Sequence, residues 1–175
     1  MENVKAANYL CFYALLQMIL QDIGIGGYDQ YRLADGMGVV VPKGYAISQV
    51  KSLTESVEVA QFGTHVSMDN LNAYFKNEKI PVKAKYISAN PYDEYYDENE
   101  KYVIYMLSYG HLFHKPELEE VGHAVMKIAF ISNRIIRIYD PGPTGSGVKD
   151  VDLFDLYSSI YKRSGGVYIF EKVEE

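Results

Sequence analysis

The sequence predicts an α+β fold, in which helices precede an antiparallel sheet. Apolar residues in the first half recur every three to four positions, whereas those in the second half form short runs of β-branched and aromatic residues. No Pro/Gly/Ser-rich linker or internal repeat divides the chain, so we expect a single domain over residues 1–175. An apolar content of 48% is enough to build a core and excludes a disordered chain.

The clearest helix lies near the N-terminus and runs from Leu10 to Ile23. Gly24 is expected to end it, because glycine readily leaves the helical conformation. Its apolar face is predicted to contain Phe12, Leu15, Leu16, Ile19, Leu20 and Ile23. Weaker helical patterns predict three further helices at Tyr28–Ala34, Ile47–Ser56 and Met68–Asn77.

Five strands are expected after this helical part, because β-branched and aromatic residues become frequent there. They are Val82–Ile87, Tyr102–Leu107, His123–Ile131, Arg134–Tyr139 and Gly166–Glu171. One more helix, Asp152–Tyr161, is predicted between the last two strands. Two polar stretches, Asn90–Lys101 and His111–Gly122, are interpreted as loops, and loops of this length often carry function.

The third and fourth strands are predicted to form a hairpin around a two-residue turn at Ser132-Asn133. This register pairs Phe130 with Ile135, Ile128 with Arg137, and Met126 with Tyr139. The fourth strand then ends at Asp140, near His123 on the third strand. The carboxylate of Asp140 is therefore expected to approach the imidazole of His123.

Charge and composition restrict the partners of the protein. A net charge of −6 leaves no basic surface for a phosphate backbone, so we expect no nucleic-acid partner. No apolar run reaches eighteen residues, and the first residues lack the pattern of a signal peptide. A cytoplasmic protein without membrane insertion is expected. The tyrosines Tyr92, Tyr95 and Tyr96 lie among acidic residues and favour an interaction loop or substrate lid.

Cys11 is the single cysteine, so it cannot form an internal disulfide or a multi-thiolate metal site. It lies in the first turn of the N-terminal helix, where free backbone N–H groups and the helix dipole favour a thiolate. This position suits a nucleophile. The alternative is a small apolar residue packed at the end of a helix.

His123 and Asp140 supply the two other groups that an activated thiol requires. Alone, His123 could be a structural histidine at the start of a half-buried strand, and Asp140 a turn residue before Pro141. Together with Cys11 they match a nucleophile, a general base and an acidic residue that orients the base.

Three segments resemble papain-like cysteine peptidases of the C39 type, which include bacteriocin-processing peptidase domains. They are the helix from Cys11 through Met18-Ile19-Leu20 with its Ile23-Gly24 turn, the strand Gly122-His123-Ala124-Val125, and the segment Ile138-Tyr139-Asp140-Pro141-Gly142. The resemblance implies a papain-like fold and a peptide or acylated substrate. It also implies Cys11 as nucleophile, His123 as general base and acid, and Asp140 as the orienting residue, with no cofactor.

The sequence departs from the family pattern at two positions. Lys5 stands where members carry the glutamine that donates to the oxyanion, and Phe12 stands where glycine is common. Asn8 is then the nearest amide donor, together with the backbone N–H of Cys11. Three functions stay open: a thiol hydrolase of peptide or amide bonds, an acyltransferase with the same triad, and an inactive papain-like binding module.

A second group of polar residues lies in the predicted loop His111–Gly122. Its potential metal ligands are His111, His114, Glu117, Glu119 and Glu120. Pro116 interrupts any helix that would align them, so we interpret the segment as a solvated loop at the rim of the cleft and expect no metal. The sequence leaves the substrate and the oligomeric state undetermined.

Overall fold

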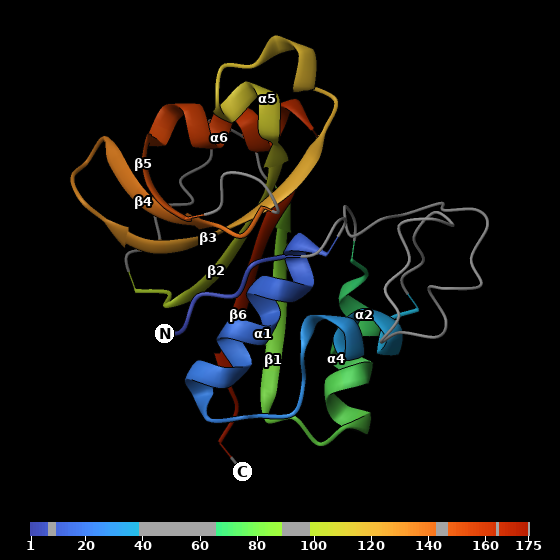
Figure 1. The fold of residues 1–175 in the computed structure, drawn as a ribbon. Coiled ribbons are helices and arrows are strands. Elements are labelled where there is room, and N and C mark those ends of the chain that lie inside the picture. Colours follow the sequence, from blue (N-terminus) through green and yellow to red (C-terminus); the bar gives the residue numbers. More distant parts are fainter. Residues whose placement is uncertain (7–9, 39–65, 89–98, 143–146, 164, 175) are drawn as a thin grey trace.

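The computed structural model describes residues 1–6, 10–38, 66–88, 99–142, 147–163 and 165–174 (Figure 1). Three of the sequence predictions lie outside these residues. They are the helix Ile47–Ser56, the oxyanion candidate Asn8 and the group Tyr92, Tyr95 and Tyr96.

The centre of the molecule is a six-stranded antiparallel sheet in the order β1-β6-β2-β3-β4-β5. Its strands are β1 (Val82–Ser88), β2 (Tyr102–Ser108), β3 (Gly122–Phe130), β4 (Ile135–Asp140), β5 (Gly147–Asp152) and β6 (Gly166–Lys172). The final strand inserts between β1 and β2, so the C-terminal segment joins the two parts of the sheet. The predicted α+β class is confirmed.

Helices cover both faces of this sheet (Figure 1). They are α1 (Cys11–Ile23), α2 (Gln30–Gly36), α4 (Met68–Asn77), α5 (Tyr109–Leu112) and α6 (Leu153–Lys162), with a 3₁₀ turn at Pro116–Leu118. Alternate side chains of each strand enter separate cores. On β2, Ile104 and Met106 pack in the core under α1 and α4, whereas Tyr105 and Leu107 pack in the core under α6.

Helix α1 confirms the prediction made from apolar spacing. It begins at Cys11, and its buried side chains include all the predicted ones except Ile23, which is half-buried. Gly24 ends the helix in the left-handed region, at φ 98°, where its N–H contacts the carbonyls of Gln21 and Leu20. A side chain would be strained in that conformation.

The predicted register of the β3–β4 hairpin is wrong near its turn and correct at its far end. Phe130 pairs with Ile136 and Ala129 with Arg137, because the turn is longer than two residues. The register shifts between Lys127 and Ala129, so the extra residue Ile128 is accommodated as a bulge. This shift restores the predicted pairing of Met126 with Tyr139, which brings Asp140 toward His123.

Other predictions need correction. Strand β5 was not predicted, since its sequence Gly-Val-Lys-Asp-Val-Asp is too polar to match the strand pattern. The stretch predicted as the loop His111–Gly122 contains the end of α5 and the 3₁₀ turn. The helix predicted at Tyr28–Ala34 begins two residues later, because the Asp29 side chain accepts a hydrogen bond from the Arg32 N–H and caps it.

Candidate active site

Cys11 is the first residue of α1 and lies where this helix packs on β3. Two hydrogen bonds hold residues 4–6, which lie before it in the chain. The Ala6 N–H donates to the Pro141 carbonyl at 2.7 Å, and the Tyr139 hydroxyl donates to the Val4 carbonyl at 2.8 Å. Residues 4–6 are thereby tied to the end of β4.

His123 and Asp140 form a buried pair across neighbouring strands. Nε2 of His123 lies 2.6 Å from Oδ1 of Asp140. The Asp140 carboxylate is fully buried and has two further donors. The Gly142 N–H lies 2.9 Å from Oδ1, and the Lys149 ammonium lies 2.9 Å from Oδ2. Both carboxylate oxygens are therefore satisfied, which a buried charge requires.

The Cys11 thiol lies beside the His123 ring, and the two side chains interact. Because Nε2 of that ring contacts Asp140, the nitrogen left for the sulfur is Nδ1. The backbone N–H groups of Ala124 and Phe12 also contact the sulfur, so the first turn of the helix contributes directly. The three predicted site residues thus come together in the order sulfur, imidazole, carboxylate.

These contacts shift the protonation of all three groups. Burial alone would raise the pKa of Cys11, but the hydrogen bond and charge of His123 outweigh it and lower that pKa. Burial would lower the pKa of His123, and the Asp140 and Cys11 contacts raise it to about 9. For Asp140, the bonds from His123, Lys149 and Gly142 overcome burial and bring the pKa to about 2. The directions favour a thiolate facing an imidazolium at neutral pH.

An aromatic pair covers the other side of the imidazole. The Tyr109 ring meets His123 edge to face, with centroids 5.3 Å apart, and Phe113 packs on Tyr109 at 4.8 Å. Gly110 between them has no room for a side chain, because a Cβ would collide with the backbone of Lys115 and Leu118. This packing holds α5 against the 3₁₀ turn and restricts the His123 ring.

The two departures from the family pattern are accommodated differently. Phe12 points away from the site and is fully buried, in edge contact with Tyr168 at 5.0 Å. Lys5 is exposed, and its carbonyl accepts a hydrogen bond from the Gln30 side chain at 3.0 Å. The sequence analysis missed Tyr109 and Lys149, because neither lies in a motif. The β-branched Val148 and Val151 were the only local signals for the strand that carries Lys149.

The histidines of the α5 region do not gather into a metal site. His114 pairs with Asp155 at 3.3 Å, and His111 lies on α5. Across the described residues, no three His, Cys, Asp or Glu side chains are close enough to hold a metal ion.

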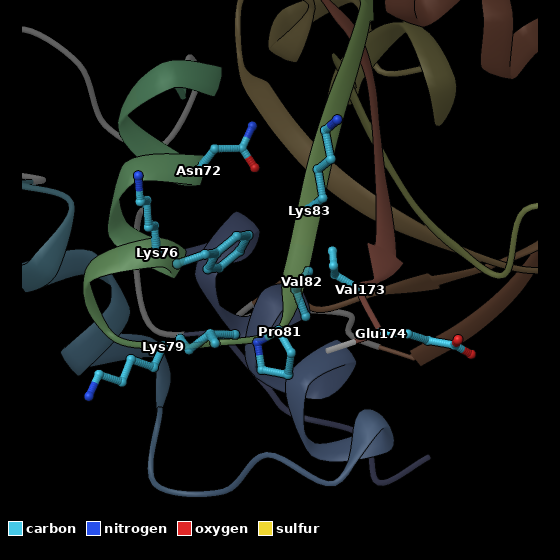
Figure 2. A pocket seen from close by; sticks show the side chains of 10 residues that line it. Asn72, Lys76, Lys79, Pro81, Val82, Lys83, Val173 and Glu174 are labelled. Atoms are coloured by element: carbon cyan, nitrogen blue, oxygen red, sulfur yellow. The ribbon is translucent and has the colours of Figure 1, made fainter.

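A cavity of about 570 Å³ lies elsewhere, at the end of α4 and the start of β1 (Figure 2). Apolar side chains from Phe75, Ile80 and Val82 line it, together with three lysines. Neither Cys11 nor His123 is among its lining residues, so we do not include it in the candidate site.

A solved structure matches this arrangement over nearly its whole length. It is the peptidase domain of Streptococcus ComA, a bi-functional ABC transporter involved in a quorum-sensing pathway. The TM-score is 0.59 at 14% sequence identity, and the match covers 98% of this chain and 97% of that domain. The chain has a papain-like fold. The papain-like fold expected from the three resembling segments is therefore confirmed.

Sequence comparisons add no further relatives. No protein-family model matches the chain, and no curated protein sequence matches it. The likeness to the ComA peptidase domain is thus one of fold. Among the described residues of this papain-like chain, no helix is long and apolar enough to cross a membrane.

Proposed function

We propose that the protein is a cysteine peptidase-like hydrolase that cleaves a peptide or amide bond through Cys11, His123 and Asp140. One observation supports the proposal most strongly: Cys11 at the start of a helix lies beside the imidazole of His123, which is hydrogen-bonded to the buried carboxylate of Asp140. The likeness of fold to a peptidase domain supports it.

In the first half of the proposed reaction, the Cys11 thiolate attacks the carbonyl carbon of the substrate. A carbon–sulfur bond forms, and the carbonyl oxygen becomes an oxyanion. When the carbon–nitrogen bond breaks, the imidazolium of His123 gives its Nδ1 proton to the departing amine. The products of this half are a free amine, a thioester at Cys11 and a neutral His123.

In the second half, neutral His123 takes a proton from water, and the resulting hydroxide attacks the thioester. The carbon–sulfur bond breaks, which releases a carboxylic acid and restores the thiolate–imidazolium pair. Asp140 keeps the His123 ring in the orientation that presents Nδ1 to the sulfur and stabilises the imidazolium. Its carboxylate keeps its charge throughout.

The oxyanion needs donors near the start of α1. The backbone N–H of Cys11 is our candidate, because the first N–H groups of a helix have no partner within the helix. Asn8 remains our candidate for the side-chain donor. Loss of one such donor typically lowers turnover about 10²–10³-fold, so Asn8→Ala tests this assignment.

Alkylation of Cys11 by iodoacetamide tests the proposal without knowledge of the substrate. Because the chain has one cysteine, the labelled fraction measured by mass spectrometry reports that thiol alone. We expect a midpoint of the rate against pH well below the ordinary thiol value of about 8.5. His123→Ala should raise this midpoint, whereas His111→Ala on α5 serves as the matched control and should leave it unchanged. A wild-type midpoint near 8.5 that ignores His123→Ala contradicts the proposal and supports a binding module.

The fate of the thioester separates hydrolysis from acyl transfer. With p-nitrophenyl acetate as acyl donor, we expect a burst of p-nitrophenolate followed by decay of the acetyl-enzyme in water. If decay requires an added amine such as glycinamide, the protein is an acyltransferase with the same triad. Absence of the burst is the result expected of an inactive binding module, the alternative that the exposed Lys5 at the position of the family glutamine favours.

A further inference from the structure

Lys149 contacts the candidate triad from the side opposite His123. Its ammonium nitrogen lies 2.9 Å from Oδ2 of Asp140, whereas His123 occupies Oδ1. The same ammonium lies over the Phe113 ring, 4.5 Å from the ring centroid. Contact with a buried carboxylate and an aromatic face holds this lysine in one position.

The sheet explains why this lysine reaches Asp140. Lys149 lies directly opposite Ile138 on β4, so the two side chains share a face of the sheet. Asp140 is two residues beyond Ile138 and points to that same face. Lys149 is about one-third exposed while Asp140 is fully buried, so the ammonium approaches the carboxylate from the solvent side.

The four groups alternate in charge when the site is active. They are the thiolate of Cys11, the imidazolium of His123, the carboxylate of Asp140 and the ammonium of Lys149. With Lys149 the group is neutral, and without it the group carries one net negative charge in poorly solvated surroundings. That excess negative charge would disfavour ionisation of the Cys11 thiol and raise its pKa. The thiolate is affected because it is the last of the four charges to form as pH rises.

We propose that Lys149 is a positioning residue of the reaction, which holds the Asp140 carboxylate toward His123 and offsets its charge so that the Cys11 thiolate forms at lower pH. This inference rests on the proposed function, since it assigns Lys149 a role through the same triad. Lys149 itself touches neither the sulfur nor the imidazole in the contacts described.

Other ionisable groups around the site do not supply this charge. Tyr13 on α1 and Tyr139 on β4 have pKa values raised chiefly by burial, so both stay neutral in the pH range of interest. Tyr109 from α5 presents its ring to His123. Lys115 lies over the Tyr109 ring, 5.5 Å from its centroid, whereas the ammonium that contacts Asp140 is that of Lys149.

The test is the pH midpoint of Cys11 alkylation in Lys149→Met, which keeps the length of the side chain but removes its charge. At a separation on the order of 10 Å, loss of one charge raises the midpoint by about 0.3 to 1 pH unit. Lys149→Arg keeps the charge and should restore the wild-type midpoint. Lys172→Met removes an equal charge from the exposed end of β6 and should have no effect.

The outcomes distinguish this inference from the proposed function. A low wild-type midpoint that Lys149→Met leaves unchanged overturns the role of Lys149 and preserves the triad. An ordinary wild-type midpoint overturns the proposed function itself. If Lys149→Met does not fold, as judged by circular dichroism, Lys149→Gln provides the same loss of charge with a polar side chain and the same expected shift. A downward shift in either variant also overturns the inference.

Discussion

Replacing Asp140 by asparagine removes the charge at the centre of the buried hydrogen-bond network. The carboxylate accepts bonds from His123, Gly142 and Lys149 and has no exposed surface. An asparagine can still accept from His123 and Gly142, but its amide nitrogen would then face the Lys149 ammonium. The variant therefore sets two donors against each other in a buried position.

The size of the effect follows from the pKa of Asp140. The contacts lower it to about 2, against about 3.9 in an unfolded chain. Each pKa unit corresponds to about 1.4 kcal/mol, so the charged carboxylate stabilises the fold by about 2.5 kcal/mol at pH 7. A group with a lowered pKa contributes this stability above its unfolded pKa and loses it as pH falls through the folded value. About half should remain at pH 3, and little at pH 2.

Urea unfolding of wild type and Asp140→Asn at pH 7 and pH 3 measures this difference. We expect the gap in unfolding free energy to narrow by about 1.3 kcal/mol at pH 3, because the part that comes from the carboxylate charge falls to about half. Asp150→Asn is the matched control, because Asp150 is also a β5–β4 ion-pair carboxylate but lies exposed, and its loss should matter little. Equal urea midpoints for wild type and Asp140→Asn at both pH values would refute the argument.

Three further variants test other parts of the structure. Cys11→Ser should leave the urea midpoint unchanged, because residue 11 is only half-buried, and should abolish iodoacetamide labelling, because the thiol is gone. If Cys11 were merely a packed apolar residue, the same substitution would lower the free energy of unfolding by about 1–3 kcal/mol. Phe12→Ala should lower the free energy of unfolding by about 3–5 kcal/mol in urea, since its ring is fully buried against Tyr168. The Asn72 side chain bonds both the N–H and the carbonyl of Ala84 on the edge strand β1. Asn72→Ala should cost about 1 kcal/mol per lost bond in urea and promote self-association in size-exclusion chromatography.

The sequence predicted the parts of the fold in which apolar periodicity is strong. Helix α4 has the predicted bounds, and α1 begins within a residue of its prediction. The strands that carry His123 and Asp140 were also expected, because both are rich in β-branched and aromatic residues. The prediction that Cys11 converges with this pair depended on the resemblance to a family, since periodicity does not specify which strand of the sheet a helix packs on.

The missed elements are those whose position depends on distant contacts. Strand β5 is an edge strand with exposed Val148 and a polar sequence, so its pairing with β4 determines it more than its own residues do. Helix α5 is a single turn that begins where the Ser108 side chain accepts a bond from the His111 N–H. Lys149 and Tyr109 lie on these two elements, which is why sequence reasoning found the triad but not its surroundings.

The end of β4 contacts both the general base and the N-terminal segment of the chain. Three consecutive residues form hydrogen bonds with different parts of the chain. The Tyr139 hydroxyl donates to the Val4 carbonyl, the Asp140 carboxylate bonds the His123 ring, and the Pro141 carbonyl accepts from the Ala6 N–H. The same strand end therefore orients the base and anchors the segment that leads into the cysteine helix. Because Asp140 and Pro141 are adjacent, a shift of this strand end would act on the His123 contact and on the Ala6 contact at once. The strand end that orients the imidazole therefore also holds residues 4–6, and in the sequence it is one of the three segments that resemble the C39 peptidases.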